Sequence, residues 1–159
     1  YCHATAFYSY ALYVAGEADK GFKVLRSLLP GGGKNTIERC NQLPLYIPNF
    51  YRGTAAGRKA GLSSHSPNSG TAAWYYRTAI AMLLGVRADL DALVIDPHLP
   101  SHWPGAKVWR RWRGTEFNIE IRKAEKNEKP RVEFDGKVIE GNRVPVQKTG
   151  TKHTVLVVK

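Results

Sequence analysis

The spacing of apolar residues along the chain changes near residue 93. Before that point the helical spacing predicts helices over residues 4–15, 17–29 and 72–85. From residue 93 onward, apolar and polar positions alternate as in strands. Strands are predicted over 93–95, 107–112, 115–123, 131–134, 137–139 and 154–158. We therefore expect an α+β chain in which helices precede a small antiparallel β-sandwich.

The first and third predicted helices are apolar on nearly every face. The three predicted helices, two of them apolar on nearly every face, cannot bury one another and also be covered by one small sheet. Residues 1–91 are therefore expected to be the last part of a larger helical domain, and residues 92–159 a C-terminal β-domain. The opening segment Tyr1-Cys2-His3-Ala4 has neither an initiator Met nor a signal-peptide pattern, which favours a fragment of a longer chain.

Composition narrows the classes of partner. The net charge is +11, but Lys and Arg alternate with Glu and Asp over residues 120–143 and no nucleic-acid-binding motif accompanies them. No apolar run approaches the roughly 20 residues that span a bilayer. We expect neither a nucleic-acid nor a membrane partner. Cys2 and Cys40 lack metal-ligand spacing, which suits two reduced thiols in a cytoplasmic protein.

The best candidate site is the start of the third helix, Ser69-Gly70-Thr71. Ser69 suits an N-cap, Gly70 allows a ligand to approach the backbone, and Thr71 adds a hydroxyl. The free amides and the helix dipole at such a start can bind an anion. The same residues also describe an ordinary capped helix, and both interpretations stay open at this point.

His3 is the second candidate, since it opens a helix rich in aromatic residues. Its imidazole suits either a satisfied core group or a donor facing a pocket. The other histidines show no metal spacing, so no metal site is expected. No pair of carboxylates is placed for glycoside hydrolysis, so no catalytic residue is predicted within this chain.

Several segments, found in this order, carry a family resemblance: Tyr1-Cys2-His3-Ala4, Ser69-Gly70-Thr71-Ala72-Ala73-Trp74-Tyr75-Tyr76-Arg77, Leu84-Gly85-Val86-Arg87, Leu93-Val94-Ile95-Asp96-Pro97-His98-Leu99-Pro100 with Trp103, and Lys107-Val108 with Arg113-Gly114. Together they resemble the inverting phosphorylases of glycoside hydrolase family 94, of the cellobiose, cellodextrin and cellobionic acid type. The resemblance extends over roughly residues 1–123. Beyond that point only the strand pattern supports the interpretation.

The resemblance implies the end of an (α/α)6 six-hairpin barrel followed by a small β-domain. It implies cleavage of a β-linked glucosyl disaccharide or oligosaccharide by inorganic phosphate, with inversion, to give α-glucose 1-phosphate. Phosphate is then a co-substrate and no cofactor is needed. The general acid of the family is an Asp expected upstream of Tyr1, and family members are often homodimers.

Carried over by position, His3, Ser69, Gly70 and Thr71 resemble the phosphate-binding residues of the family. The basic residues Arg52, Arg58 and Lys59 stand in the intervening loop, and we hypothesise that they bind an acceptor sugar, such as the acidic sugar gluconate. A solvated loop explains them equally well.

Two other functions stay open. The aromatic-rich β-domain suits a non-catalytic carbohydrate-binding module, and a cyclic β-glucan synthase can carry the same phosphorylase domain. The linkage and the acceptor sugar are not fixed by the sequence.

Overall fold

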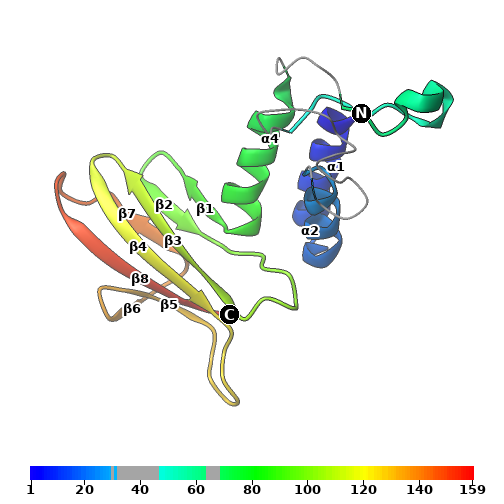
Figure 1. The fold of residues 1–159 in the computed structure, drawn as a ribbon. Helices are drawn as coiled ribbons and strands as arrows, with labels where there is room; N and C mark the ends of the chain where they lie inside the picture. Colours follow the sequence, from blue (N-terminus) through cyan, green and yellow to red (C-terminus); the bar gives the residue numbers. More distant parts are fainter. Residues whose placement is uncertain (30, 32–46, 64–68) are drawn as a thin grey trace. The chain divides into compact units, whose positions relative to one another are not determined.

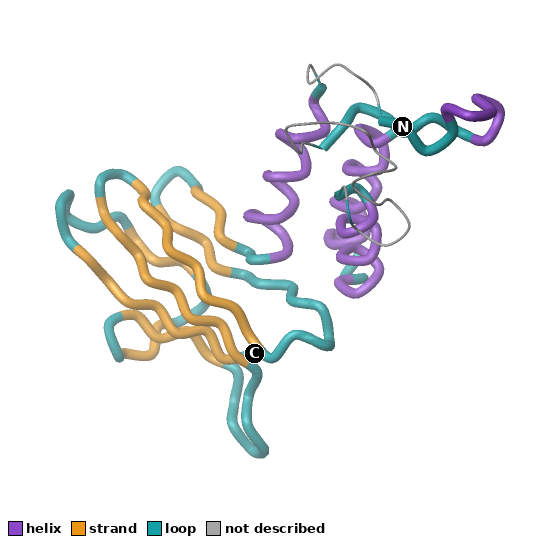
Figure 2. Tube along the Cα trace, in the orientation of Figure 1, coloured by secondary structure: helices purple, strands orange, loops and turns teal. Residues whose placement is uncertain are grey.

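The computed structural model describes residues 1–29, 31, 47–63 and 69–159. They form two compact units, Tyr1–Ala79 and Ile80–Lys159. The first unit is helical and the second holds all the strands (Figures 1 and 2). The predicted α+β class is therefore confirmed.

Among its described residues the first unit holds three α-helices and one 3-10 helix, and the apolar spacing predicts the first two of these α-helices. Gly16, which has a φ of +79°, follows α1, and the Ser9 hydroxyl in α1 donates a hydrogen bond to the Gly21 carbonyl in α2. The third predicted helix ends at Thr78 and continues as a short π-helix rather than as α-helix to residue 85. The bounds are α1 Cys2–Val14, α2 Ala18–Ser27, η1 Thr54–Lys59, α4 Gly70–Thr78 and η2 Ala79–Leu83.

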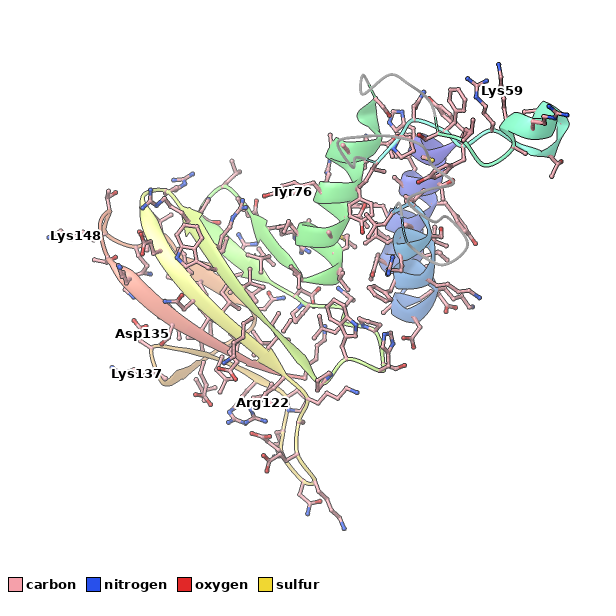
Figure 3. The ribbon with its side chains drawn as sticks, viewed as in Figure 1. Lys59, Tyr76, Arg122, Asp135, Lys137 and Lys148 are labelled. Carbon is pink, nitrogen blue, oxygen red and sulfur yellow. The ribbon has the colours of Figure 1, made fainter. Side chains whose placement is uncertain are left out.

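The helical unit buries few of its large apolar side chains. Cys2, Ala6 and Leu28 form a small buried cluster. Large apolar side chains on α1 and α4, together with Tyr1, are between 42% and 68% exposed: Tyr1, Phe7, Tyr8, Val14 and Tyr76. In Figure 3 the side chain of Tyr76 points outward from α4. These two helices therefore present aromatic surface in the first unit.

The second unit contains two sheets. The three-stranded sheet has the order β1-β2-β7, and the five-stranded sheet the order β3-β4-β8-β5-β6. Their inner faces contribute to one core, which includes Leu93, Phe117 and Val155. The bounds are β1 Val86–Ala88, β2 Ala92–Ile95, β3 Gly105–Trp112, β4 Thr115–Arg122, β5 Arg131–Phe134, β6 Lys137–Ile139, β7 Arg143–Pro145 and β8 Lys152–Val158.

The predicted sandwich is confirmed as a β-domain, but the expectation that it is wholly antiparallel is wrong. β4 pairs with β8 in parallel, from Glu116 opposite Lys152 to Arg122 opposite Val158. Alternation of apolar residues fixes which face of a strand is buried, but not the direction of its neighbour. Strands β1 and β7 were also not predicted.

One close approach locks the start of the three-stranded sheet. Gly85 has a φ of +66°, and a Cβ atom built on it would lie 2.0 Å from the backbone carbonyl of Asp96. The amide of Asp96 donates to the Gly85 carbonyl at 2.8 Å. Only glycine combines this backbone conformation with this contact.

Ion pairs tie the loop between β4 and β5 to the sheet. Glu128 accepts hydrogen bonds from Arg122 at 2.6 and 2.7 Å and from Arg131 at 2.7 Å. The Arg122 guanidinium, the backbone amide of Glu125 and Arg131 together hold the pKa of Glu128 far below its usual range. The position of Arg122 at the end of β4 is visible in Figure 3.

Candidate functional site

The starts of two helices meet in the first unit. His3 lies in the first turn of α1, and Gly70 is the first residue of α4. A Cβ atom built on Gly70 would lie 2.5 Å from both Cε1 and Nε2 of the His3 ring. The imidazole therefore rests directly on the glycine backbone, which no residue with a side chain would allow. The structure thus brings together the two candidates that lie 67 positions apart in the sequence.

The Nε2 atom of His3 is buried and has no hydrogen-bond partner among the described residues. A buried polar atom without a partner costs roughly 1–3 kcal/mol, so an arrangement that keeps one requires an explanation. A ligand that fills the missing hydrogen bond is such an explanation. The position of Nε2 against the start of α4 indicates where that ligand would lie.

The ring of His3 is held in place by aromatic neighbours. Its centroid lies 4.6 Å from that of Phe7, and Phe7 meets Trp74 edge-on with centroids 4.5 Å apart. The guanidinium of Arg77 lies 4.9 Å from the Trp74 centroid. These contacts join the first turns of α1 to the middle of α4. The imidazole is thereby fixed over the start of α4 by packing.

Ser69 caps α4 as predicted. Its backbone is extended, and its Oγ accepts a hydrogen bond from the Thr71 amide at 3.0 Å. The same Oγ donates to Oδ1 of Asn49 at 3.0 Å and lies 2.6 Å from the hydroxyl of Thr71. Because a hydroxyl has one proton, Thr71 must be the donor of the 2.6 Å bond. Both hydroxyl protons are therefore used within this cluster.

Because both hydroxyl protons are used internally, the hydroxyls of Ser69 and Thr71 are not free donors for an anion. Thr71 is fully buried, so its hydroxyl serves the cap in the structure as it stands. An anion at the start of α4 would first meet His3 and the first-turn N–H groups that Ser69 does not cap. To donate a hydrogen bond to the anion, the Ser69 hydroxyl would have to give up its bond to Asn49, and the Thr71 hydroxyl its bond to Ser69.

Asn49 is a member of the site that the sequence did not reveal. Its backbone carbonyl accepts the amide of Cys2 at 2.8 Å, next to His3 in the first turn of α1. Its side chain accepts the hydroxyl of Ser69 at the start of α4. One residue therefore binds the starts of both helices. The only sequence signal was its place between two prolines in a long loop, which does not distinguish it from its neighbours.

The electrostatics of this region favour an anion. Neither α1 nor α4 carries an acidic residue in its first turn, where a carboxylate would compete for the helix amides. The positive end of the α4 dipole faces the same space as His3. The arrangement can therefore bind a small anion through an imidazole and backbone N–H groups.

The basic loop residues lie elsewhere in the first unit. Tyr51 and Ser63 form an antiparallel bridge, and Arg52 exchanges backbone hydrogen bonds with Gly61 and Leu62. The 3-10 helix at the tip of this hairpin carries Arg58 and Lys59. The side chains of Arg52, Arg58 and Lys59 make no hydrogen bond or ion pair with any described residue. In Figure 3 Lys59 points outward from the hairpin.

The described carboxylates beside β2 are already occupied. Asp89 and Asp91 each accept a hydrogen bond from Arg143, and Asp96 accepts one from Lys159. The hydrogen bond from Arg143 lowers the pKa of Asp89. No group of three His, Cys, Asp or Glu side chains suited to a metal ion is found among residues 1–29, 31, 47–63 and 69–159. Cys2 is a buried cysteine that forms no disulfide within the described part of the chain, whereas Cys40 and His65 lie outside that part.

No helix in the described part of the chain is both long and apolar enough to cross a membrane.

Sequence comparison relates the chain to known enzymes. The chain is homologous to disaccharide phosphorylases, which confirms the relationship predicted from the sequence segments. Residues 86–127 match the C-terminal domain of glycosyl hydrolase family 65. This match lies within the second unit and includes β1 to β4.

Three relatives show this homology to disaccharide phosphorylases. The chain is 44% identical to cellobionic acid phosphorylase of Neurospora crassa over 126 residues, which are 77% of this chain and 16% of the relative. It is 34% identical to 3-O-beta-D-glucopyranosyl-beta-D-glucuronide phosphorylase of Paenibacillus borealis, over 76% of this chain and 16% of the relative. It is 31% identical to solabiose phosphorylase of the same organism, over 98% of this chain and 20% of the relative. The chain therefore spans about a sixth to a fifth of the length of these relatives.

Proposed function

We propose that this chain supplies one wall of the phosphate site of an inverting phosphorylase that cleaves a β-glucosidic bond and releases α-glucose 1-phosphate. The buried and unpartnered Nε2 of His3, lying against Gly70 at the start of α4, is the observation that supports the proposal best. A phosphate oxygen in this place would accept a hydrogen bond from Nε2 and face the positive end of the helix. Ser69 and Thr71 complete the site by holding the helix start in shape.

The helical unit belongs, in this proposal, to the end of an (α/α)6 barrel. The exposed aromatic side chains of α1 and α4 support this, because an isolated helical unit would leave them in water. In a barrel the same faces would pack on helices supplied by the rest of the enzyme. The second unit would be the β-domain that follows the barrel.

The reaction would proceed by direct displacement. A phosphate oxygen attacks the anomeric carbon and forms the new carbon–oxygen bond, while the glycosidic carbon–oxygen bond breaks. An Asp acting as general acid gives its proton to the leaving oxygen. No catalytic base is needed, because phosphate is already an anion. The described acids near β2 are engaged by Arg143 and Lys159, so the general acid is proposed to lie outside this chain.

The phosphate role of His3 can be tested in the full-length enzyme with His3→Ala. Loss of one hydrogen bond to a charged group costs about 1.5–3 kcal/mol, so the KM for phosphate should rise roughly 10- to 100-fold. His102→Ala, in the loop before β3, is the matched control and should leave that KM unchanged. A His3→Ala enzyme with the phosphate KM of the wild type would remove His3 from the site.

We further propose that the acceptor sugar is acidic, such as gluconate. The relative with 44% identity is a cellobionic acid phosphorylase. The side chains of Arg52, Arg58 and Lys59 make no hydrogen bond or ion pair with a described residue, and their charges are suited to a carboxylate. No cofactor beyond the phosphate co-substrate is required by this chemistry.

The acceptor proposal is tested by the rates of phosphorolysis of cellobionic acid and of cellobiose. Combined Arg58→Ala and Lys59→Ala should lower kcat/KM for cellobionic acid about tenfold or more and leave that for cellobiose nearly unchanged. Lys23→Ala, an exposed cation on α2, is the control. If the ratio of the two rates is the same in wild type and double variant, the basic loop has no part in acceptor choice.

A second candidate function is favoured by one comparison. The chain is 28% identical to Cyclic beta-(1,2)-glucan synthase NdvB of Rhizobium meliloti over 87% of this chain and 5% of that protein. A synthase would release a cyclic glucan from a glucosyl donor, whereas a phosphorylase would release glucose 1-phosphate from a disaccharide. Chromatography of the products therefore separates the two.

A further inference from the structure

The outer face of the five-stranded sheet is hollowed into a groove. Its volume is about 620 Å³, within the range of small-molecule sites, and it crosses β3, β4, β8 and β5. All its lining residues belong to the second unit. Nothing in the phosphate site uses this face. The groove is therefore a surface feature that the phosphate site does not explain.

Trp109 lies at one end of this groove on β3. Its side chain is 60% exposed, whereas Trp112 on the same strand is 9% exposed and belongs to the core. An odd number of positions separates the two, so the alternation along a strand places them on opposite faces. Leu156 of β8 also lines the groove. The groove thus offers a flat aromatic surface and an aliphatic floor that stay in contact with solvent.

Polar groups are placed in register with this ring. Asn118 of β4 stands opposite Trp109, and Thr154 of β8 stands opposite Asn118. Neither the Asn118 carboxamide nor the Trp109 indole N–H makes a hydrogen bond with any described residue. The carboxamide supplies two donors and an acceptor, and the indole one donor. These groups lie in one row with the aromatic surface.

The charges of the groove cancel locally. Lys107 lies 3.8 Å from Glu120, and Glu133 is bound to Arg131 at 2.6 Å. Although the chain has a net charge of +11, Lys107 is the only Lys or Arg among the described residues that line this groove, and it lies beside Glu120. A neutral occupant matches it best. That occupant must combine many hydroxyl groups with an apolar face that can lie on an indole ring.

We propose that this groove binds a neutral oligosaccharide of β-linked glucosyl units. A β-glucosyl ring carries its hydroxyls in the equatorial plane and presents C–H groups on both faces. One face can therefore lie on Trp109 while the hydroxyls at its rim bind Asn118. A sugar hydroxyl can also donate to the Thr154 hydroxyl, which gives its own proton to Asp135. An elongated chain of such rings fits a groove that crosses four strands. The choice of glucose rests on the proposed function, whereas the preference for a neutral sugar rests on the groove alone.

The proposal is tested by native electrophoresis of the full-length protein through gels that contain a soluble neutral β-glucan. The gels contain no phosphate, so turnover cannot interfere. Trp109→Ala should weaken retardation at least about tenfold, which corresponds to about 1.4 kcal/mol. Leu90→Ala removes another exposed apolar side chain of the same unit, at 86% exposure, and should be retarded like the wild type.

Asn118→Ala provides a second variant with the ring intact and should also weaken retardation. Equal retardation of wild type and Trp109→Ala would overturn the proposal, and so would retardation by carboxymethyl cellulose in place of the neutral glucan. The disaccharide phosphorolysis rate is measured separately on the same proteins. Retardation without phosphorolysis would refute the proposed enzyme but keep the groove, and phosphorolysis without retardation would do the reverse.

Discussion

Replacing Gly70 by Ala adds one methyl group at the contact between Gly70 and the His3 ring, on which the phosphate proposal rests. The new Cβ would lie 2.5 Å from Cε1 and Nε2 of His3, well inside van der Waals contact. The ring is the end of a side chain, so it can move away while the backbone stays in place. We therefore expect Gly70→Ala to displace the imidazole from the start of α4 without unfolding the protein.

Two opposing terms set the stability of this variant. Ala in place of Gly in a helix stabilises by up to about 1 kcal/mol. Displacing His3 from Phe7 loses an aromatic contact of about 0.5–1.5 kcal/mol. The free energy of unfolding should therefore lie between about 0.5 kcal/mol above and about 1.5 kcal/mol below that of the wild type. Phosphate binding would lose the Nε2 hydrogen bond, and the KM for phosphate should rise roughly 10- to 100-fold.

The assay has two parts, both in the full-length protein. Initial rates are measured against phosphate concentration, and the NMR signal of the His3 ring reports its displacement whether or not the enzyme turns over. Gly53→Ala is the matched control, because a Cβ there meets nothing within 4 Å. A displaced ring together with an unchanged phosphate KM would refute the reasoning, since the site would then function without His3.

Three further outcomes follow from the contacts described above. Asn49→Ala removes the acceptor of the Ser69 hydroxyl and should lower the free energy of unfolding by about 0.5–1.5 kcal/mol in urea titrations, whereas Asn49→Asp should retain most of it. Gly85→Ala forces a Cβ against the Asp96 backbone at a positive φ and should cost more than about 3 kcal/mol, seen as loss of soluble protein. The pKa of Glu128 is lowered by folding, so its stabilising contribution is present above the unfolded pKa of about 4.3 and is lost as the pH falls. The wild-type unfolding temperature should therefore drop between about pH 5 and pH 2, and Glu128→Gln should flatten this decline; parallel curves would contradict the assignment.

Much of the fold followed from periodicity. The alternation of residues 105–139 predicted the ends of β3 to β6 to within about two residues. Hairpin turns such as Asp135-Gly136 mark clearly where one strand ends and the next begins. The parallel pairing of β4 with β8 did not follow, because strand direction depends on the path of the chain between them. The end of α4 at Thr78 was likewise not predicted, because the composition of residues 79–83 suits an α-helix as well as the π-helix that they form.

The candidate site could be predicted in part. His3 and the Ser69-Gly70-Thr71 segment were each ambiguous alone, and only the family resemblance joined them. The structure gives that pairing a physical cause in the contact of the imidazole with the glycine backbone. Asn49 could not be found, because its role depends on a carbonyl and a carboxamide that reach two helices distant in sequence.

The place of β8 in the middle of its sheet has a consequence for how the second unit forms. β8 pairs with β4 on one side and with β5 on the other, and its partners in β4 lie 36 positions earlier in the chain. Until β8 arrives, β3–β4 and β5–β6 are separate hairpins with open edges, which are prone to pair with other chains. Sheet closure is therefore a long-range and slow event that must wait for the ribosome to release residues 152–158. Chaperone contact during synthesis would be concentrated on this interval, while the helices have already been made.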